Sequence, residues 1–96
     1  MEILNEIQDW YNSCCNGEWE HDFGIKIGTI DNPGWSVEIN LTATKNQNVE
    51  FEDIKIERDE NDWVHCSVKN NIFFGYGGPK NLRGILEIFI KKIVIP

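Results

Sequence analysis

The sequence predicts an α+β domain. Along the chain, an N-terminal helix comes first, an antiparallel meander of four to five strands follows, and a C-terminal helix closes the domain. Three patterns predict it. Apolar residues recur at helical spacing near both ends of the chain, apolar and polar residues alternate with a period of two between them, and turn-forming residues separate the alternating runs. Because each helix has one apolar stripe and the sheet one apolar face, we expect both helices to pack on the same face.

Residues 2–15 form the predicted N-terminal helix. Six apolar residues fall on one stripe at helical spacing: Ile3, Leu4, Ile7, Trp10, Tyr11 and Cys14. Asn16 and Gly17 follow, and both residue types tolerate the left-handed conformation in which helices often end. The predicted helix therefore stops before residue 16.

The middle of the chain carries the period-two pattern of half-buried strands. The predicted strands are residues 21–30, 35–43, 50–58 and 63–69, with a short fifth strand at 72–74 as an option. Pro33 and Gly34 suit the turn between the first two strands. The Gly-Tyr-Gly-Gly segment at 75–78 is interpreted as a loop, and it lacks the Gly-Lys-Ser/Thr ending of a phosphate-binding loop.

Residues 80–94 form the predicted closing helix. Pro79 suits a helix start because its missing N–H costs nothing there. The buried stripe of this helix is expected to comprise Leu82, Ile85, Leu86, Phe89 and Ile93. Across the domain we expect Ile25, Ile39, Ile56 and Leu86 in the core, together with the inward residues Val64, Cys66 and Val68 of the fourth strand.

Length and charge restrict the function. A chain of 96 residues makes one domain, 1–96, with little room for a deep pocket. Its net charge of −7 disfavours nucleic acids and anionic membranes and favours a basic protein partner. No signal peptide or transmembrane segment is visible, and the three cysteines are an odd number with two of them adjacent. These features predict a cytoplasmic protein without a disulfide framework.

No cofactor or metal site is expected. His21, His65 and the three cysteines lack the spacing of zinc ligands, and Cys66 points away from His65 on its strand. The inward cysteines are expected to be inert packing groups rather than nucleophiles. A small intracellular enzyme or accessory domain that uses His21 or His65 stays open as an alternative.

Trp63 and His65 form the sharpest candidate site. If Val64 and Cys66 face inward, both side chains stand on the solvent side of the sheet, where an aromatic residue can anchor a protein partner. The predicted partner-binding residues are Glu38, Asp53, Glu57, Trp63 and His65. The alternative is that Trp63 packs under a loop or along Lys55. Trp19 and Trp35 are expected at the edge of the core.

Several segments, spread in order along nearly the whole chain, carry a family resemblance. They are Trp10-Tyr11, Trp19-Glu20-His21, Gly24-Ile25-Lys26-Ile27, Asp31-Asn32-Pro33-Gly34-Trp35, Ile54-Lys55-Ile56-Glu57-Arg58, Asn61-Asp62-Trp63 and Leu86-Glu87-Ile88-Phe89. With these segments the chain resembles the bacterial immunity protein 53 family. The resemblance implies a non-catalytic protein that binds and neutralises the cognate toxin of a polymorphic toxin system. A basic toxin suits the acidic chain, and a nuclease is one candidate because nucleases are often basic. A general protein-binding adaptor is a further alternative, and the oligomeric state is left open.

Overall fold

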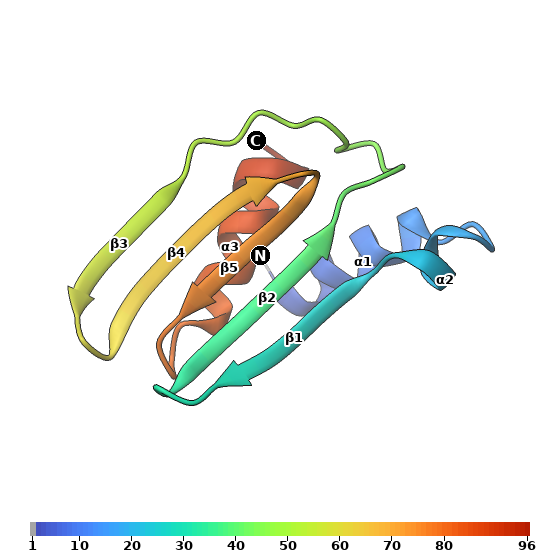
Figure 1. The fold of residues 1–96 in the computed structure, drawn as a ribbon. Coiled ribbons are helices and arrows are strands. Elements are labelled where there is room, and N and C mark those ends of the chain that lie inside the picture. The colour runs from blue at the N-terminus through green and yellow to red at the C-terminus, as the bar shows by residue number, and fades with distance from the viewer. Residues whose placement is uncertain (1) are drawn as a thin grey trace.

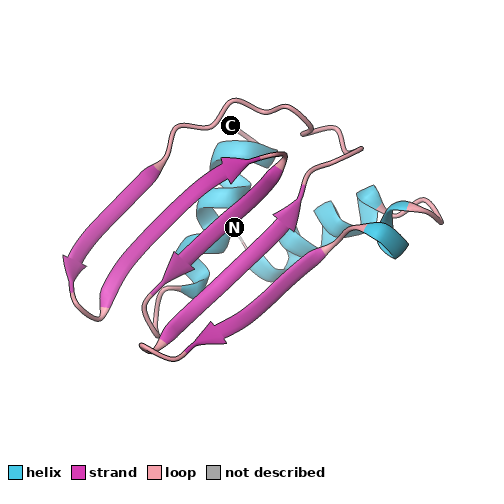
Figure 2. Cartoon of the chain, in the orientation of Figure 1, coloured by secondary structure: helices cyan, strands magenta, loops and turns pink. Residues whose placement is uncertain are grey.

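A five-stranded antiparallel sheet with helices against one face is the architecture of the computed structural model, which describes residues 2–96 (Figure 1). The elements in chain order are α1 (Ile3–Cys14), α2 (Trp19–Asp22), β1 (Ile25–Ile30), β2 (Gly34–Asn40), β3 (Ile54–Asp59), β4 (Asp62–Lys69), β5 (Ile72–Gly77), α3 (Leu82–Phe89) and the π-helical turn η1 (Ile90–Val94). The predicted α+β class is confirmed, and so are the N- and C-terminal helices on one face (Figure 2).

The strand order differs from a simple meander. It is β1-β2-β5-β4-β3, with every neighbouring pair antiparallel. After β2, the segment 41–53 crosses the end of the sheet to the far edge, where β3 begins (Figure 1). This crossing leaves a position beside β2 that the last strand, β5, fills. The central strand of the sheet is therefore β5, the strand for which the sequence pattern is weakest.

The structure corrects the prediction of a short fifth strand and a glycine loop, because β5 continues to Gly77. Gly75 and Gly77 face α3, and neither has room for a side chain. A Cβ on Gly75 would overlap Cγ2 of Ile85, and one on Gly77 would lie 3.0 Å from Cβ of Asn81. These glycines serve close helix–strand contact rather than a turn.

The first predicted strand is too long, because residues 19–22 form the short helix α2. Local hydrogen bonds stabilise it. Asn16 Oδ1 accepts from the backbone N–H of Trp19 at 2.9 Å, and the Glu20 carboxylate accepts from the N–H of Gly17 at 2.8 Å. Side chains thus satisfy N–H groups at the start of the helix, as in other helix caps. Trp19 is buried, and the strand starts only at Ile25.

Other boundaries move as well. Strand β2 ends at Asn40 rather than 43, where the Asn40 side chain accepts from the N–H of Thr42 and Ala43 takes a positive φ. Strand β3 begins at Ile54 rather than 50. Helix α3 begins at Leu82, so Pro79 lies before it, and the Pro79 carbonyl accepts from Nε1 of Trp35 at 2.9 Å.

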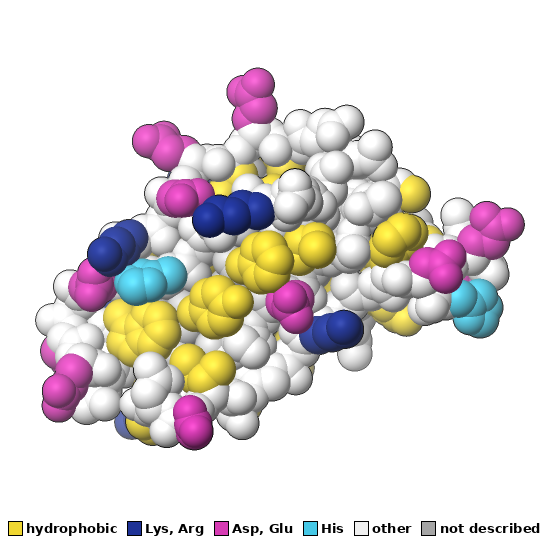
Figure 3. All heavy atoms as spheres, in the orientation of Figure 1, with side chains coloured by type: hydrophobic (Ala, Val, Ile, Leu, Met, Phe, Trp, Pro, Cys, Tyr) yellow, Lys and Arg dark blue, Asp and Glu magenta, His cyan; other side chains and the backbone are white. Residues whose placement is uncertain are grey.

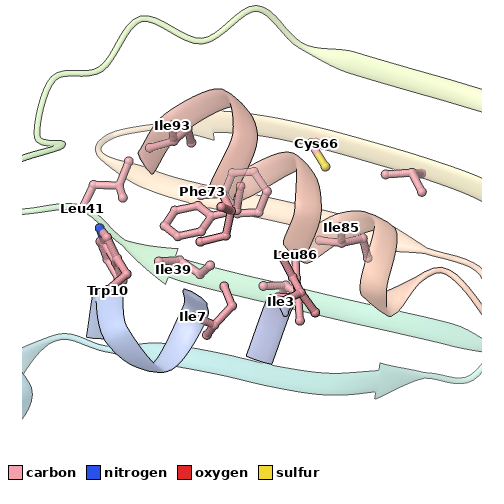
Figure 4. Close-up of a cluster of buried hydrophobic side chains, with 14 of the residues drawn as sticks. Ile3, Ile7, Trp10, Ile39, Leu41, Cys66, Phe73, Ile85, Leu86 and Ile93 are labelled. Carbon is pink, nitrogen blue, oxygen red and sulfur yellow. The ribbon is translucent and has the colours of Figure 1, made fainter. Parts of the chain in front are cut away.

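The core is one hydrophobic cluster between the sheet and the helices (Figure 4). Trp10 of α1 lies edge-on to Phe89 of α3, with ring centroids 5.0 Å apart. Its Nε1 donates to Asn46 Oδ1 at 2.8 Å, and Asn46 Nδ2 donates to the carbonyl of Ile93 at 3.1 Å. One asparagine therefore connects the crossing segment to both helical ends of the chain.

Most of the predicted core residues are buried. Ile39 and Leu86 are 0% and 3% exposed, and Val64 and Cys66 are also buried. Ile25 is half-buried at the margin of the cluster. Ile56 is a correction, because it is half-buried and outside the cluster. It lies on an edge strand, where burial against the helices ends.

Fewer apolar residues of α1 are buried than the sequence predicted. Ile3, Ile7 and Trp10 are buried, whereas Leu4 and Tyr11 are 60% and 39% exposed. These two residues lie seven positions apart and so on the same side of the helix. An apolar strip of α1 is therefore left in contact with solvent.

Truncation of the core should follow the observed burial. We expect Ile39→Ala and Leu86→Ala each to lower the free energy of unfolding by roughly 2–5 kcal/mol, because each leaves a cavity. Ile56→Ala should cost clearly less, since that side chain is half-buried. Urea unfolding of the three variants measures the difference, and an equal loss in all three would contradict the edge position of Ile56.

Because Gly75 lies in close contact with α3, we expect a methyl group added at Gly75 to lower stability more than one added at Gly28. Gly75→Ala should cost roughly 1–3 kcal/mol, because the new Cβ overlaps a fully buried isoleucine. Gly28→Ala is the matched control, since a Cβ there lies 3.7 Å from Ser36 Oγ. Thermal unfolding should place the control close to the parent, and a Gly75→Ala variant of parental stability would refute the close contact.

Candidate functional site

The candidate site lies on the sheet face opposite the helices. Alternation along β4 places Val64 and Cys66 in the core and turns Trp63, His65 and Ser67 to the other side. The prediction that Val64 and Cys66 face the core is therefore confirmed. We call the surface formed by the outward residues of the five strands the open face.

Strand β5 adds three residues that the sequence interpretation missed: Ile72, Phe74 and Tyr76. They alternate with the inward residues of β5, and Tyr76 is the direct cross-strand partner of His65. Figure 3 shows the resulting band of hydrophobic side chains across this face. The alternation of large side chains with Gly75 and Gly77 could have revealed it, had the glycines not suggested a loop.

Trp63 is half-buried, and its backbone is held at both ends. Its N–H donates to Asn81 Oδ1 at 3.3 Å, and its carbonyl accepts from the N–H of Gly78 at 3.1 Å. The indole lies against the His65 imidazole, with ring centroids 5.0 Å apart and planes inclined by 58°. Trp63 is thus a fixed aromatic side chain with part of its surface in solvent.

Glu57 is the cross-strand neighbour of Trp63 and contacts two other polar groups. Its Oε1 lies 3.3 Å from Lys55 Nζ and 3.8 Å from His65 Nε2. At 3.8 Å the histidine is not hydrogen-bonded, and its Nε2 is buried without a partner within the described chain. A polar atom at hydrogen-bonding distance would be needed to satisfy it.

Of the two remaining predicted residues, Asp53 lies near His65, whereas Glu38 lies farther across the sheet. Asp53 precedes β3 and lines a shallow hollow of about 250 Å³ with His65, Ser67 and Tyr76. Glu38 lies on β2, on the other side of β5, and is the cross-strand partner of Phe74. The meander prediction, which places strand two beside strand three, is therefore wrong: β5 and β4 lie between β2 and β3, and β5 separates Glu38 from Trp63.

Charge is mixed on the strands and acidic at one end of the face. The outward carboxylates are interleaved with lysines at positions 26, 55 and 69. At the end of the sheet where Trp63 lies, the β3–β4 turn contributes Asp59, Glu60 and Asp62. Hydrogen bonds from Arg58 and Asn81 lower the pKa of Asp62, so this carboxylate is ionised and internally paired.

The groups considered for catalysis do not converge. Burial raises the pKa of the Cys66 thiol to about 12, which keeps it protonated and unreactive. His21 lines a separate hollow of about 310 Å³ with Lys26, Glu38 and Asn40. Within residues 2–96, no three His, Cys, Asp or Glu side chains come together to hold a metal ion.

A membrane-spanning helix is not found among the described residues either. The three cysteines are free thiols in the structure.

Comparison with known proteins gives one family. The sequence profile of the family described as Immunity protein 53 matches residues 4–94 of the 96-residue chain. No curated protein and no solved structure gives a significant match. The profile covers the whole fold from α1 to η1 apart from Ile3, so the chain belongs to the immunity protein 53 family.

Proposed function

We propose that this protein is a non-catalytic immunity protein that neutralises a cognate toxin domain by binding it with the open face. The observation that carries the proposal is the band of Trp63, Tyr76, Phe74 and Ile72 on a sheet face that none of the described helices covers (Figure 1). Family membership supplies the kind of partner, since an immunity protein acts on a toxin.

Trp63 is the anchor of the proposed interface. Large aromatic side chains with part of their surface available are the residues that most often dominate protein interfaces. The hydrogen bonds of the Trp63 backbone to Asn81 and Gly78 fix its main chain, and the contact with the His65 ring restrains the indole. A side chain that is already ordered loses little conformational entropy on association, which favours affinity.

His65 and Glu57 supply polar specificity beside the anchor. The buried Nε2 of His65 lacks a hydrogen-bond partner and faces the Glu57 carboxylate at 3.8 Å. A polar group of the toxin can bind the Glu57 carboxylate, whose side chain is 58% exposed. Asp53 and Tyr76 border the same hollow and are available for further hydrogen bonds at its rim.

The charge of the chain favours a basic toxin. The net charge of −7 attracts a cationic domain over long range, and the acidic turn beside Trp63 orients it on approach. A nuclease toxin is one domain type with the required positive surface, because nuclease substrates are polyanions. The site of action we propose is the cytoplasm of the producing cell. Glu38 lies at the opposite margin of the proposed interface, beyond Phe74.

Removal of the aromatic anchor should weaken toxin binding while the fold survives. We expect Trp63→Ala to raise the dissociation constant tens- to hundreds-fold, since truncation of a central aromatic anchor costs about 2–4 kcal/mol. Tyr76→Ala should weaken binding too. Tyr11→Ala is its matched control, because the two tyrosines are 38% and 39% exposed but lie on opposite sides of the sheet.

Calorimetric titration with the toxin encoded beside this gene measures these affinities, and circular dichroism checks the fold. Growth rescue of cells that express the toxin provides a second readout. Parental affinity in both open-face variants, with a loss in Tyr11→Ala, would move the interface to the helical side and overturn the proposal.

Reversal of a rim charge should act mainly on the association rate. Glu57→Lys and Asp53→Lys should each slow association and reduce its dependence on salt, with a smaller change in dissociation. Asp9→Lys on α1 changes the net charge equally but lies on the helical side, so it should have a smaller effect. Stopped-flow association at low and high salt separates them, and equal effects would show that only net charge acts.

A further inference from the structure

The two edges of the sheet differ in how they are protected. Edge strand β3 carries charged side chains along most of its length and a register irregularity between Glu57 and Asp59. Both features discourage pairing with another strand. Edge strand β1 has no such irregularity, contains one charged residue, Lys26, and leaves Ile27 46% exposed. Its outer backbone groups form an unguarded template for strand addition.

The unguarded edge continues into an apolar surface on α1. A groove of about 370 Å³ lies between α1 and β1, lined by Ile7, Gln8, Tyr11, Phe23, Gly24 and Ile25. Leu4, 60% exposed, lies on the same side of α1 as Tyr11. A strand that adds to β1 would therefore cover exposed apolar side chains as well as backbone groups.

We propose that β1 is a self-association edge on which a second copy of this chain adds its own β1 antiparallel, forming one continuous sheet. Charge favours this occupant. The strand Ile25–Ile30 has no carboxylate in a chain of net charge −7, so two acidic copies can approach here with least repulsion. A basic toxin would find only Lys26 along the same strand, so this edge does not suit it.

A two-fold axis at Ile27 gives a consistent register. Ile27 of each copy then faces Ile27 of the other on the helical side, and Lys26 faces Gly28 on the open side, so the two lysines are diagonal neighbours and do not directly oppose each other. Facing positions keep the same side of the sheet, because directly paired strand residues share one face. Both open faces of the dimer stay accessible, and each can hold a toxin. The inference is independent of the proposed function.

Sedimentation equilibrium of the full chain at increasing concentration tests the proposal. The parent should be a reversible dimer. Ile27→Lys should raise the dimer dissociation constant roughly a hundredfold or more, since it places two like charges at the two-fold axis. Leu4→Lys, on an exposed helical position, should weaken the dimer without touching the strand. Glu57→Lys adds positive charge to the other edge and should leave dimerisation unchanged.

A parent chain that stays monomeric at all concentrations, or a dimer that survives Ile27→Lys in folded form, overturns the proposal. A monomeric parent whose toxin affinity falls in Ile27→Lys would assign this edge to the toxin instead, which also overturns it. Loss of toxin binding in Trp63→Ala tests the open face alone. If Trp63→Ala binds the toxin normally, the proposal for the open face fails but the proposed pairing of β1 is unaffected. The two proposals can therefore be tested separately.

Discussion

The structure depends on the close contact between α3 and the central strand β5. Gly75 and Gly77 remove the side chains that would hold the helix away, and Ile85 occupies the space that they leave. This contact places the helix over the middle of the sheet, where burial is most complete. It also requires that the large residues of β5, apart from Phe73, point to the other side. Alternation along β5 thus places the glycines under the helix and the large apolar residues on the open face.

A second constraint joins the ends of the chain to its middle. Asn46, in the segment that crosses between β2 and β3, bonds Trp10 of α1 and the carbonyl of Ile93 in η1. Because that segment must travel from one side of the sheet to the far edge, its path needs fixed points, and buried polar groups need partners. The same hydrogen bonds meet both needs.

Such a scaffold suits a protein that acts by binding. A domain of this size has shallow hollows rather than a deep cleft, and its titratable side chains are spread over separate surfaces. What it presents is a rigid sheet whose outward residues are positioned by strand register. In the proposed function, the main chains of Trp63, bonded to Asn81 and Gly78, and of Tyr76, paired with His65, have fixed positions before a partner binds. A stoichiometric inhibitor benefits from this order, since little entropy is lost on association.

The sequence by itself determined the local features: an N-terminal helix, predicted at residues 2–15 and found at Ile3–Cys14, the inward Val64 and Cys66, and the outward Trp63 and His65. These follow from the periodicity of side chains along one element, which needs no knowledge of its neighbours. The quoted segments also identified the family. Only the tertiary structure decided that β5 lies between β2 and β4, that Phe74 and Tyr76 join Trp63, and that Glu38 is separated from it. Strand order depends on pairings between distant segments, and a glycine is equally compatible with a turn and with close packing, so periodicity cannot choose between them.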